Sequence, residues 1–416
     1  MSALIFLITI ILLLAGYFFY GKLLKGVVGV DLSLKTPALT RYDGIDYVPA
    51  KNWVILFGHH FASIAGAGPI VGPVFAYIYW GWVGVLVWLI FGSIFMGAVH
   101  DFISLFISVR EGGSTIGQIA QKYISRRASI VFLIFLWCAL IIVIAVFASI
   151  CAKSFISEPK IVLPSLGLIP VAMIVGILIY RLKTNTFFAT LFGLGLLTFL
   201  VFLGNQIPTQ LLMANPYIGW LVILFVYAFF ASVIPVNILL QPRDYISSFL
   251  LFFGIAVSFI AIIAKPLPIV SSHFFSFSSE IGPFFPLMFI TVACGAISGF
   301  HSLVSSGTTS KQLSSEAHTQ RIGYGAMIVE AVLAAIALVC VAFGLKNIPQ
   351  GKTPVEAFAL GFSRIVFFLG PYANFIALVI LNAFILTTLD TATRITRFIT
   401  QELLNIKNKF LATAIV

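Results

Sequence analysis

Apolar runs long enough to cross a lipid bilayer recur along almost the whole chain of 416 residues. A spanning helix needs roughly 20 apolar residues. The first run, Ala3 to Tyr20, lacks the basic leader and the small-residue cleavage pattern of a removed signal peptide. Ten further runs qualify, at about 53–76, 82–108, 128–150, 163–180, 186–204, 218–240, 246–264, 284–306, 322–344 and 366–389.

Charged side chains are too scarce for a water-soluble fold. They make up 9% of the residues, against about 25% in typical soluble domains. The sequence therefore predicts an all-α integral membrane protein with about 11 transmembrane helices. One N-terminal helix and its loop are expected at 1–50, followed by a core at 51–416.

The basic residues divide unequally between the two sides of the predicted helices. If the loops alternate, one side receives 18 of the 24 Lys and Arg residues and the other receives 6. Cytoplasmic loops are enriched in basic residues, so we expect an outside N-terminus and a cytoplasmic C-terminal end. The net charge of +11 does not indicate nucleic acid, because the basic residues form no continuous stripe.

The second predicted helix contains the string FGHHFASIAGAGPIVGP, which is rich in glycine and proline. In a helix interior Gly costs about 1 kcal/mol and Pro about 3 kcal/mol, so we expect unwinding near Gly66 to Pro69. Free backbone inside a membrane is tolerated only where it lines a cavity or is buried in protein. The alternative is a kinked or closely packed helix.

The seventh predicted helix ends in FFASVIPVNILLQPRDY, where two prolines bracket Asn237 and Gln241. It lies five spans after the second helix, so the two run in opposite directions. This relation predicts a five-plus-five inverted repeat, with helices 2–6 at about 51–205 and helices 7–11 at about 216–400. Arg243 and Asp244 are then expected at the cytoplasmic exit.

Two later runs carry polar side chains. In the ninth, Ser298, Ser302, Ser305 and Thr309 follow the spacing of one helix face, with His301 beside it. This face predicts a solute or ion path, and the alternative is hydrogen bonding to carbonyl groups or to a neighbouring helix.

The eleventh run holds Asp390 and Arg394, which are spaced as an i, i+4 pair. We expect this pair near the cytoplasmic end of the last helix.

Glu330 is the ionisable residue placed deepest in an apolar run. It lies eight residues inside the tenth run, with no basic residue nearby in sequence; eight residues of helix measure about 12 Å. Such residues are functional by default, although a neutral, hydrogen-bonded acid is an equal alternative. His59, His60 and Asp101 are the competing proton carriers.

Metal and enzyme sites are not expected. No H-E-x-x-H motif occurs, the adjacent histidines point about 100° apart on a helix, and the four cysteines have no C-x-x-C spacing. Ser298 and His301 lack a third group and a G-x-S-x-G elbow, which argues against a serine hydrolase.

These motifs together are similar to the carbon starvation protein A family. The strings are GHHFASIAGAGPIVGP, HDFISLFISVREGGSTIG, LLQPRDY, FITVACGAISGFHSLVSSGTTSKQL, IGYGAM and NAFILTTLDTATRITR, and the resemblance covers about 50–405. It implies an inner-membrane transporter of the amino acid-polyamine-organocation superfamily, with a LeuT-like core, associated with peptide uptake in carbon starvation. Close relatives of that family take up pyruvate with protons.

Two departures from the family are visible. Many members are much longer, so this chain is either a naturally short form or part of a longer one. The usual QDF motif reads His100-Asp101-Phe102, so no role is carried over for His100.

We therefore expect a secondary active transporter, driven by H⁺ or possibly Na⁺, that imports short peptides or pyruvate. No nucleotide-binding motif is present, and no cofactor is expected. The expected partners are a small-molecule solute and the lipid bilayer, without nucleic acid, and the oligomeric state stays open. The rival class is a channel or a membrane sensor.

Unwound backbone at the break exposes N–H groups and a helix dipole that favour an anion, so a substrate carboxylate is expected there. The predicted substrate-binding residues are His59, His60, Ser63, Gly66, Ala67, Gly68, Asn237, Gln241, Ser298, His301 and Ser302. The predicted ion-coupling residues are Glu330, Asp101, Ser305 and Asp390.

Overall fold

The structure is a computed structural model that describes residues 2–31, 33–268, 274–346 and 352–416. Ten helical segments within these residues are long and apolar enough to cross a membrane: Ser2–Val28, Trp53–Trp80, Trp82–Arg110, Arg126–Ser157, Pro159–Arg181, Thr186–Gln206, Pro216–Val233, Leu240–Ala264, Glu316–Gly344 and Phe367–Leu404. The prediction of an all-α, multi-pass membrane protein is confirmed.

The spanning segments contain one or two α-helices each. Their bounds are α1 Ser2–Ala15, α2 Gly21–Val28, α4 Trp53–Ile64, α5 Gly68–Trp80, α6 Trp82–Gly92, α7 Ala98–Arg110, α9 Arg126–Ser157, α10 Val162–Gly176, α11 Thr186–Gln206, α12 Pro216–Val233, α13 Leu240–Ala264, α17 Gly325–Gly344 and α19 Ala373–Leu404. The shorter elements are α3 Pro37–Thr40, α8 Ile116–Tyr123, β1 Ser278–Ser279, β2 Gly282–Pro283, α14 Phe284–Thr291, α15 Ala293–Ala296, α16 Gly299–Gly307, α18 Pro354–Ile365 and α20 Lys409–Ile415.

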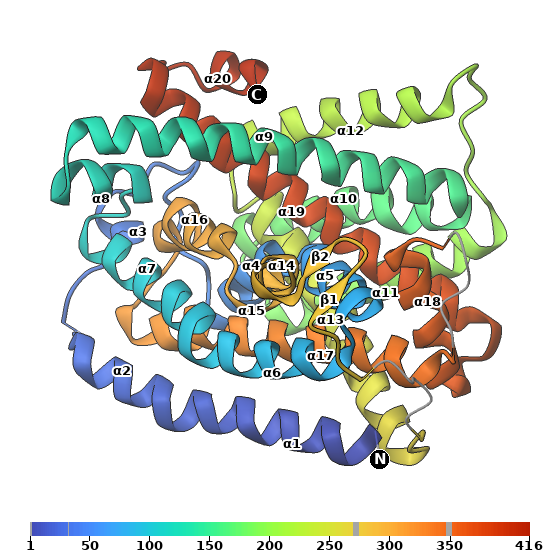
Figure 1. The fold of residues 1–416 in the computed structure, drawn as a ribbon. Helices are drawn as coiled ribbons and strands as arrows, with labels where there is room; N and C mark the ends of the chain where they lie inside the picture. Colours follow the sequence, from blue (N-terminus) through green and yellow to red (C-terminus); the bar gives the residue numbers. More distant parts are fainter. Residues whose placement is uncertain (1, 32, 269–273, 347–351) are drawn as a thin grey trace.

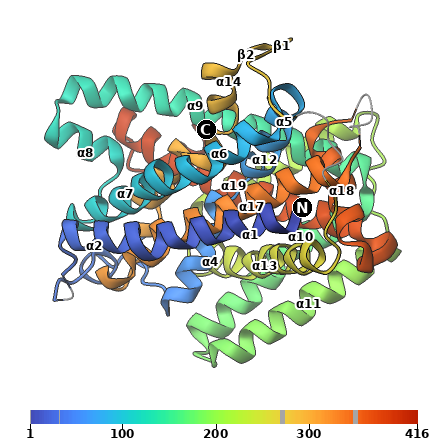
Figure 2. The same cartoon turned by 60° about the horizontal axis from the view of Figure 1, so that its bottom comes forward.

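The spanning helices form a bundle around α17 and α19 (Figure 1). These two are the most completely buried of the spanning segments, whereas α1 and α9 expose most of their apolar surface. In Figure 1, α1 and α2 run along one edge and α9 along the opposite edge. Figure 2 shows the β1–β2 hairpin and α14 projecting from one side of the bundle. The apolar outer helices therefore present the surface expected to meet lipid.

Segments predicted on the same side of the membrane gather at the same end of the bundle. At the basic end, Lys51 Nζ donates to the carbonyl of Thr184 at 2.7 Å. At the other end, the N–H of Thr209 donates to the carbonyl of Pro159 at 3.1 Å. These two contacts agree with the predicted grouping of loops, and the assignment of the basic end to the cytoplasm stays a prediction.

The predicted break in the second span is confirmed. Helix α4 ends at Ile64, Ala65 has non-helical angles (φ −76°, ψ 67°), and α5 begins at Gly68. Pro69 stands in the first turn of α5, where its missing N–H costs no hydrogen bond. The glycines and this proline thus end one helix and begin the next.

The predicted continuous helix at 284–306 is wrong. The chain there forms three short helices, α14, α15 and α16, with non-helical Ser298 (φ −35°, ψ 122°) directly before α16. Ser302 and Ser305 lie in α16, while Thr309 belongs to a separate 3₁₀ turn, Thr309–Lys311. The hydroxyl groups therefore do not share one helix face.

The proline-rich segment after α12 has a different role from the one predicted. Residues 234–239 connect α12 to α13, and Gln241 lies inside α13. Residues 234–239 are thus a connection between two separate spans, whereas the break near Gly66 lies inside one span. The second divided span of the described chain is α14–α16.

Glycine brings the two divided spans together. A Cβ on Gly68 would lie 2.3 Å from Cys294 Sγ, and a Cβ on Gly72 would lie 2.6 Å from the carbonyl oxygen of Thr291. Both distances are far below van der Waals contact, so α5 can approach α14 and α15 only where side chains are absent.

We predict that Gly68→Ala lowers the free energy of unfolding by about 1–3 kcal/mol, as expected for overpacking. Cys294→Gly removes both Cys294 atoms that the new Cβ meets, at 2.3 and 2.5 Å, so the double variant should lose less than the sum of the single variants. Thermal unfolding in detergent measures this. Gly195→Ala is the control, because its Cβ meets nothing within 4 Å. Equal losses for Gly68→Ala and Gly195→Ala would contradict the close approach.

Candidate functional site

Buried polar side chains of α4 connect two polar networks in the centre of the bundle. His59 and His60 are both fully buried, and their rings point in different directions, as adjacent positions on a helix must. His59 faces α13, and His60 faces α7. The α4 helix therefore lies between two carboxylates, Asp244 and Asp101.

The first network centres on Asp244. His59 Nδ1 lies 2.6 Å from Asp244 Oδ2, and Ser63 Oγ donates to the same oxygen at 3.0 Å. Thr391 Oγ1 of α19 donates to Ser63 Oγ at 3.1 Å. Three helices, α4, α13 and α19, thus meet at one buried carboxylate.

Gln312 extends this network towards the basic end. Its amide nitrogen Nε2 lies 3.1 Å from His59 Nε2 and its Oε1 accepts from Gln241 Nε2 at 2.7 Å. An amide nitrogen only donates, so His59 Nε2 accepts and Nδ1 carries the proton that faces Asp244. Tyr180 completes the chain by donating to Gln241 Oε1 at 2.5 Å. The predicted site residue Gln241 is therefore joined to His59 through Gln312.

The second network centres on Asp101 of α7. His60 Nε2 lies 2.9 Å from Asp101 Oδ2, and its Nδ1 lies 2.8 Å from Thr309 Oγ1. Ser305 donates from its hydroxyl to Asp101 Oδ1. The structure thereby brings together three predicted residues from three segments, namely His60, Asp101 and Ser305.

His301 links Asp101 to Glu330. His301 Nε2 lies 3.0 Å from Glu330 Oε2, and its Nδ1 lies 3.9 Å from Asp101 Oδ2. All three side chains are fully buried. Glu330, which has no basic neighbour in sequence, thus acquires one through folding. Glu330, His301, Asp101 and His60 therefore form a continuous series of buried titratable side chains.

Arg243 and Asp390 form a buried ion pair beside the first network. Arg243 Nη1 donates to Asp390 Oδ2 and, at 3.2 Å, to the carbonyl of Leu386. Tyr227 donates from its hydroxyl to Asp390 Oδ2 at 2.5 Å. The Nε and Nη2 atoms of Arg243 have no hydrogen-bond partner among the described residues. This guanidinium therefore keeps one edge free in the protein interior.

Two predictions about the charged residues Arg243, Asp244, Asp390 and Arg394 are wrong. Arg243 and Asp244, expected at the cytoplasmic exit, are fully buried, because each finds an opposite charge or a histidine inside the bundle. Asp390 and Arg394 do not pair along their helix, since Arg394 Nη1 instead donates to Asp46 Oδ1 at 2.6 Å. Tertiary contacts displace the local i, i+4 contact.

Asp46 holds a charge cluster at the basic end of the bundle, outside the spanning helices. It accepts from Arg394, and Arg397 Nη2 lies 3.0 Å from its Oδ2. Burial alone would raise the pKa of Asp46, but Arg394 and Arg397 outweigh burial and lower the pKa below its ordinary value. Asp46 is thus held ionised and fastens its loop to α19.

Other predicted residues stay apart from these networks. Asn237 Oδ1 is buried without a hydrogen-bond partner among the described residues. Ser302 donates to the carbonyl of Gly299 at 2.9 Å, as in the structural alternative. Ser298 Oγ accepts a contact from Cys294 Sγ at 3.9 Å. Among the described residues, no hydrogen bond joins any of these three side chains to a histidine or carboxylate of the two networks.

The backbone break lies one turn beyond Ser63. A Cβ on Gly66 would lie 2.8 Å from Thr388 Oγ1, and Thr388 Oγ1 donates to the carbonyl of Ser63 at 3.3 Å. Gly66, Ala67 and Gly68 are thus packed against α19 and α15 at the edge of the first network. Within the described residues, no group of three or more His, Cys, Asp and Glu side chains is arranged to hold a metal ion.

Sequence reasoning missed Arg243, Tyr227, Gln312 and Thr391 as site residues. One available signal was the charged dipeptide Arg243-Asp244, which lies between the apolar runs 218–240 and 246–264, next to Pro242. Tyr227 gives no signal, because single tyrosines are common in membrane helices, whereas Thr391 lies next to Asp390 among the polar residues of the eleventh run.

Comparison with known proteins adds independent information. Residues 1–347 match a family model described as carbon starvation protein CstA. The chain is 37% identical to the peptide transporter CstA of Campylobacter jejuni over 342 residues, covering 78% of this chain and 48% of that protein. It is 35% identical to the pyruvate/proton symporter BtsT of Escherichia coli, covering 78% of this chain and 47% of that protein.

A longer match is found in Bacillus subtilis. Its peptide transporter CstA is 32% identical, covering 97% of this chain and 75% of that protein. The chain spans about half the length of the relatives from C. jejuni and E. coli. No solved structure matches the chain.

We predict that breaking the buried Arg243–Asp390 pair from one side is costly. Arg243→Met or Asp390→Leu should each lower the free energy of unfolding by about 3–5 kcal/mol, because each leaves an unpaired buried charge. The double variant should lose clearly less than the two losses added. Thermal unfolding in detergent measures all three.

The control for this prediction is Lys352→Met, which removes an exposed pair with Glu356 at 3.0 Å and should cost less than about 0.5 kcal/mol. Strict additivity of the Arg243 and Asp390 variants would show that the pair contributes no specific interaction.

Proposed function

Because the chain belongs to the carbon starvation protein CstA family, we propose that it is a secondary active transporter. The proposed reaction is the import of a small carboxylate-bearing solute together with a proton. Relatives are named peptide transporter and pyruvate/proton symporter, and peptides and pyruvate share a carboxylate group. The basic end of the bundle is proposed to face the cytoplasm, with the N-terminus outside.

The free edge of Arg243 is the observation that carries this proposal. The Nε and Nη2 atoms form a planar fork that matches the two oxygens of a carboxylate. In Arg243 this edge has no hydrogen-bond partner among the described residues, while Nη1 is held by Asp390. A fully buried guanidinium with one edge held by a carboxylate and the other edge without a hydrogen-bond partner is suited to bind an anionic group of a solute.

We propose that the break in the second span contributes to the same site. The first N–H groups of α5 lie at the positive end of its helix dipole. Gly66 to Gly68 follow Ser63, which contacts Asp244, the sequence neighbour of Arg243. Separation of α5 from Thr388 and Cys294 would open these N–H groups to a bound carboxylate.

Glu330 and His301 are the proposed proton-coupling pair. Their Nε2–Oε2 distance of 3.0 Å is within the range of an ion pair, although the two groups lack hydrogen-bond geometry in this conformation. Burial favours keeping their charges together. Asp101 and His60 continue the series to α4, where His59 contacts Asp244. Protonation at Glu330 is therefore connected through α4 to the proposed substrate site.

The order of elements supports alternating access. The same four elements occur twice along the chain: a divided span, a long helix with a π-helical stretch, a short helix and a 32-residue helix. In the first series they are α4/α5, α6–α7, α8 and α9. In the second series they are α14–α16, the segment that ends in α17, then α18, then α19. Both short helices begin with a threonine capping box, at Thr115 and Thr353. The two series run in opposite directions between the two ends.

The packing of these two series is reciprocal. Helix α5 of the first series packs against α17 of the second, and α16 of the second packs against α7 of the first, while α9 packs against α19. We propose that the two series, 53–157 and 284–404, are the related halves of an inverted repeat. This boundary replaces the pairing of the second span with the seventh.

The experiment that tests the function is uptake into proteoliposomes that contain the 416-residue chain. Labelled pyruvate and a labelled dipeptide are offered with pH and Na⁺ gradients imposed separately. We expect saturable accumulation of one of them with an inward proton gradient. Glu330→Gln should abolish this accumulation and preserve downhill exchange, because the amide imitates a permanently protonated acid.

Three results would count against the proposal. Accumulation driven only by Na⁺ would refute proton coupling, and equilibration without saturation would indicate a channel. Accumulation that persists in Glu330→Gln but disappears in His60→Ala would move the coupling site to α4.

We predict that Arg243→Lys raises KM for the transported carboxylate roughly tenfold, because one bidentate contact of about 1.5 kcal/mol is lost. The lysine keeps a positive charge beside Asp390. Arg364→Lys, at an exposed arginine near the opposite end, is the control and should leave KM unchanged. An unchanged KM in Arg243→Lys would remove Arg243 from the substrate site.

A further inference from the structure

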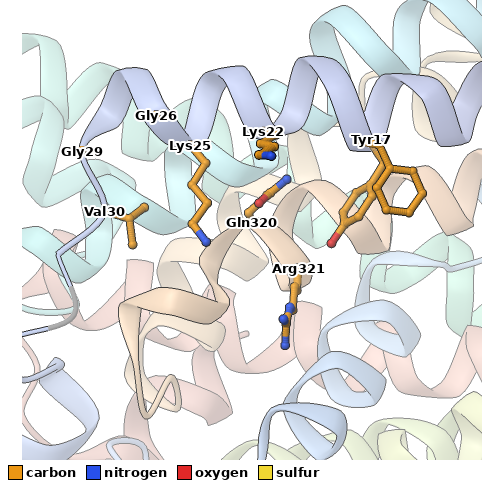
Figure 3. A pocket seen from close by; sticks show the side chains of 9 residues that line it. Tyr17, Lys22, Lys25, Gly26, Gly29, Val30, Gln320 and Arg321 are labelled. Carbon is orange, nitrogen blue, oxygen red and sulfur yellow. The ribbon is translucent and has the colours of Figure 1, made fainter.

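A basic cavity lies between the N-terminal helix pair and the helix that carries Glu330. Its volume is about 570 Å³, and Lys22 and Lys25 from α2 line it together with Gln320 and Arg321. Figure 3 shows Lys25 and Tyr17 extending from one helix towards the segment that contains Gln320 and Arg321, with Lys22 on the same helix between them. The cavity is at the basic end of the bundle, next to the expected lipid-facing surface of α1 and α2.

The positive charge in this cavity is uncompensated. No acidic side chain of the described residues lines it, and Lys22, Lys25 and Arg321 belong to none of the ion pairs of the described chain. The nearby carboxylate of Glu316 is occupied by Arg110, whose Nη2 donates to Oε2 at 2.9 Å. Three cations that share one cavity attract an anion.

An apolar groove continues from the basic cavity along the outside of α2. A second hollow of about 520 Å³ shares Lys22 and Gly26 with the first. It is bordered by Phe19, Leu23 and Val27, whose exposed fractions are 78%, 60% and 75%. The combined surface is therefore basic at its inner end and apolar along its outer, membrane-facing part.

Gly26 keeps the two hollows connected. A Cβ on Gly26 would meet nothing within 4 Å, so the space above this residue is open. A larger side chain there would start in this open space, at a residue that lines both hollows.

From this arrangement we propose that the cavity binds an anionic glycerophospholipid. The phosphate group would contact Lys22, Lys25 and Arg321, and an acyl chain would lie along Phe19, Leu23 and Val27. Basic pockets between membrane helices at a cytoplasmic surface are suited to such headgroups. A free phosphate would contact only the basic half, whereas a lipid would also contact the apolar side chains of α2 beside it. The lipid would fasten α2 to the segment that leads into α17.

The test measures lipid binding to the purified 416-residue chain by native mass spectrometry and by thermal unfolding in a neutral detergent. The probes are dioleoyl phosphatidylglycerol, dioleoyl phosphatidylcholine and inorganic phosphate. We expect phosphatidylglycerol to bind and to raise Tm, and the other two to do neither. Equal effects of phosphatidylcholine would refute charge recognition, and an equal effect of inorganic phosphate would refute a lipid.

Two variants locate the site independently. Lys22→Gln/Lys25→Gln should weaken phosphatidylglycerol binding on the order of tenfold or more, whereas Arg126→Gln/Arg127→Gln, with equal charge loss at exposed positions of the same end, should not. Gly26→Leu should weaken phosphatidylglycerol binding although it retains Lys22, Lys25 and Arg321. Its control is Gly195→Leu, another glycine with nothing within 4 Å of an added Cβ.

The proposal fails if Gly26→Leu and Gly195→Leu bind phosphatidylglycerol equally, or if the two charge variants do. Tm without lipid, measured for each variant, reports whether it is folded. Gly26→Leu keeps the proposal testable should the loss of both lysines prevent folding. Since none of these residues belongs to the central networks, failure here leaves the proposed transport function untouched.

Discussion

Every charge buried in this bundle must be solvated by the protein itself, because the hydrocarbon core of a bilayer offers no hydrogen bonds. Arg243 and Asp390 meet this requirement with each other, and Tyr227 adds its hydroxyl to the same carboxylate. Asp244 meets it through His59 and Ser63. These contacts tie α4, α12, α13 and α19 to one another, so the positions of four helices depend on a few polar atoms.

The central carboxylates lie close to the places where the helices are interrupted. The break after Ile64 is one turn from the Asp244 network, and His301 and Ser305 lie in the short helix α16. A divided helix has fewer internal hydrogen bonds to lose when it moves. Several of the groups proposed to bind a solute or a proton therefore lie on, or within one turn of, the interrupted segments of the bundle.

Charge at the basic end serves a different purpose from charge at the centre. Asp46 is fastened by Arg394 and Arg397 of α19, the same helix whose Asp390 holds Arg243 one turn earlier. The lysines of α2 face the π-helical stretch Gln320–Tyr324, which leads directly into α17 and Glu330. Both central helices are therefore connected to charged groups at the basic end of the bundle.

The sequence by itself determined most of the spanning segments, the difference in basic charge between the two ends, and the break near Gly66. These follow from hydropathy, loop charge and helix propensity, which are local properties of the chain. It also singled out His60, Asp101, His301 and Glu330, since ionisable residues inside apolar runs are rare. Only the tertiary structure decided that Arg243 is buried, that Asp390 pairs with it across 147 residues of chain, and that 284–307 is divided. These outcomes depend on which distant groups meet, and a buried charge is stable only where such a partner exists.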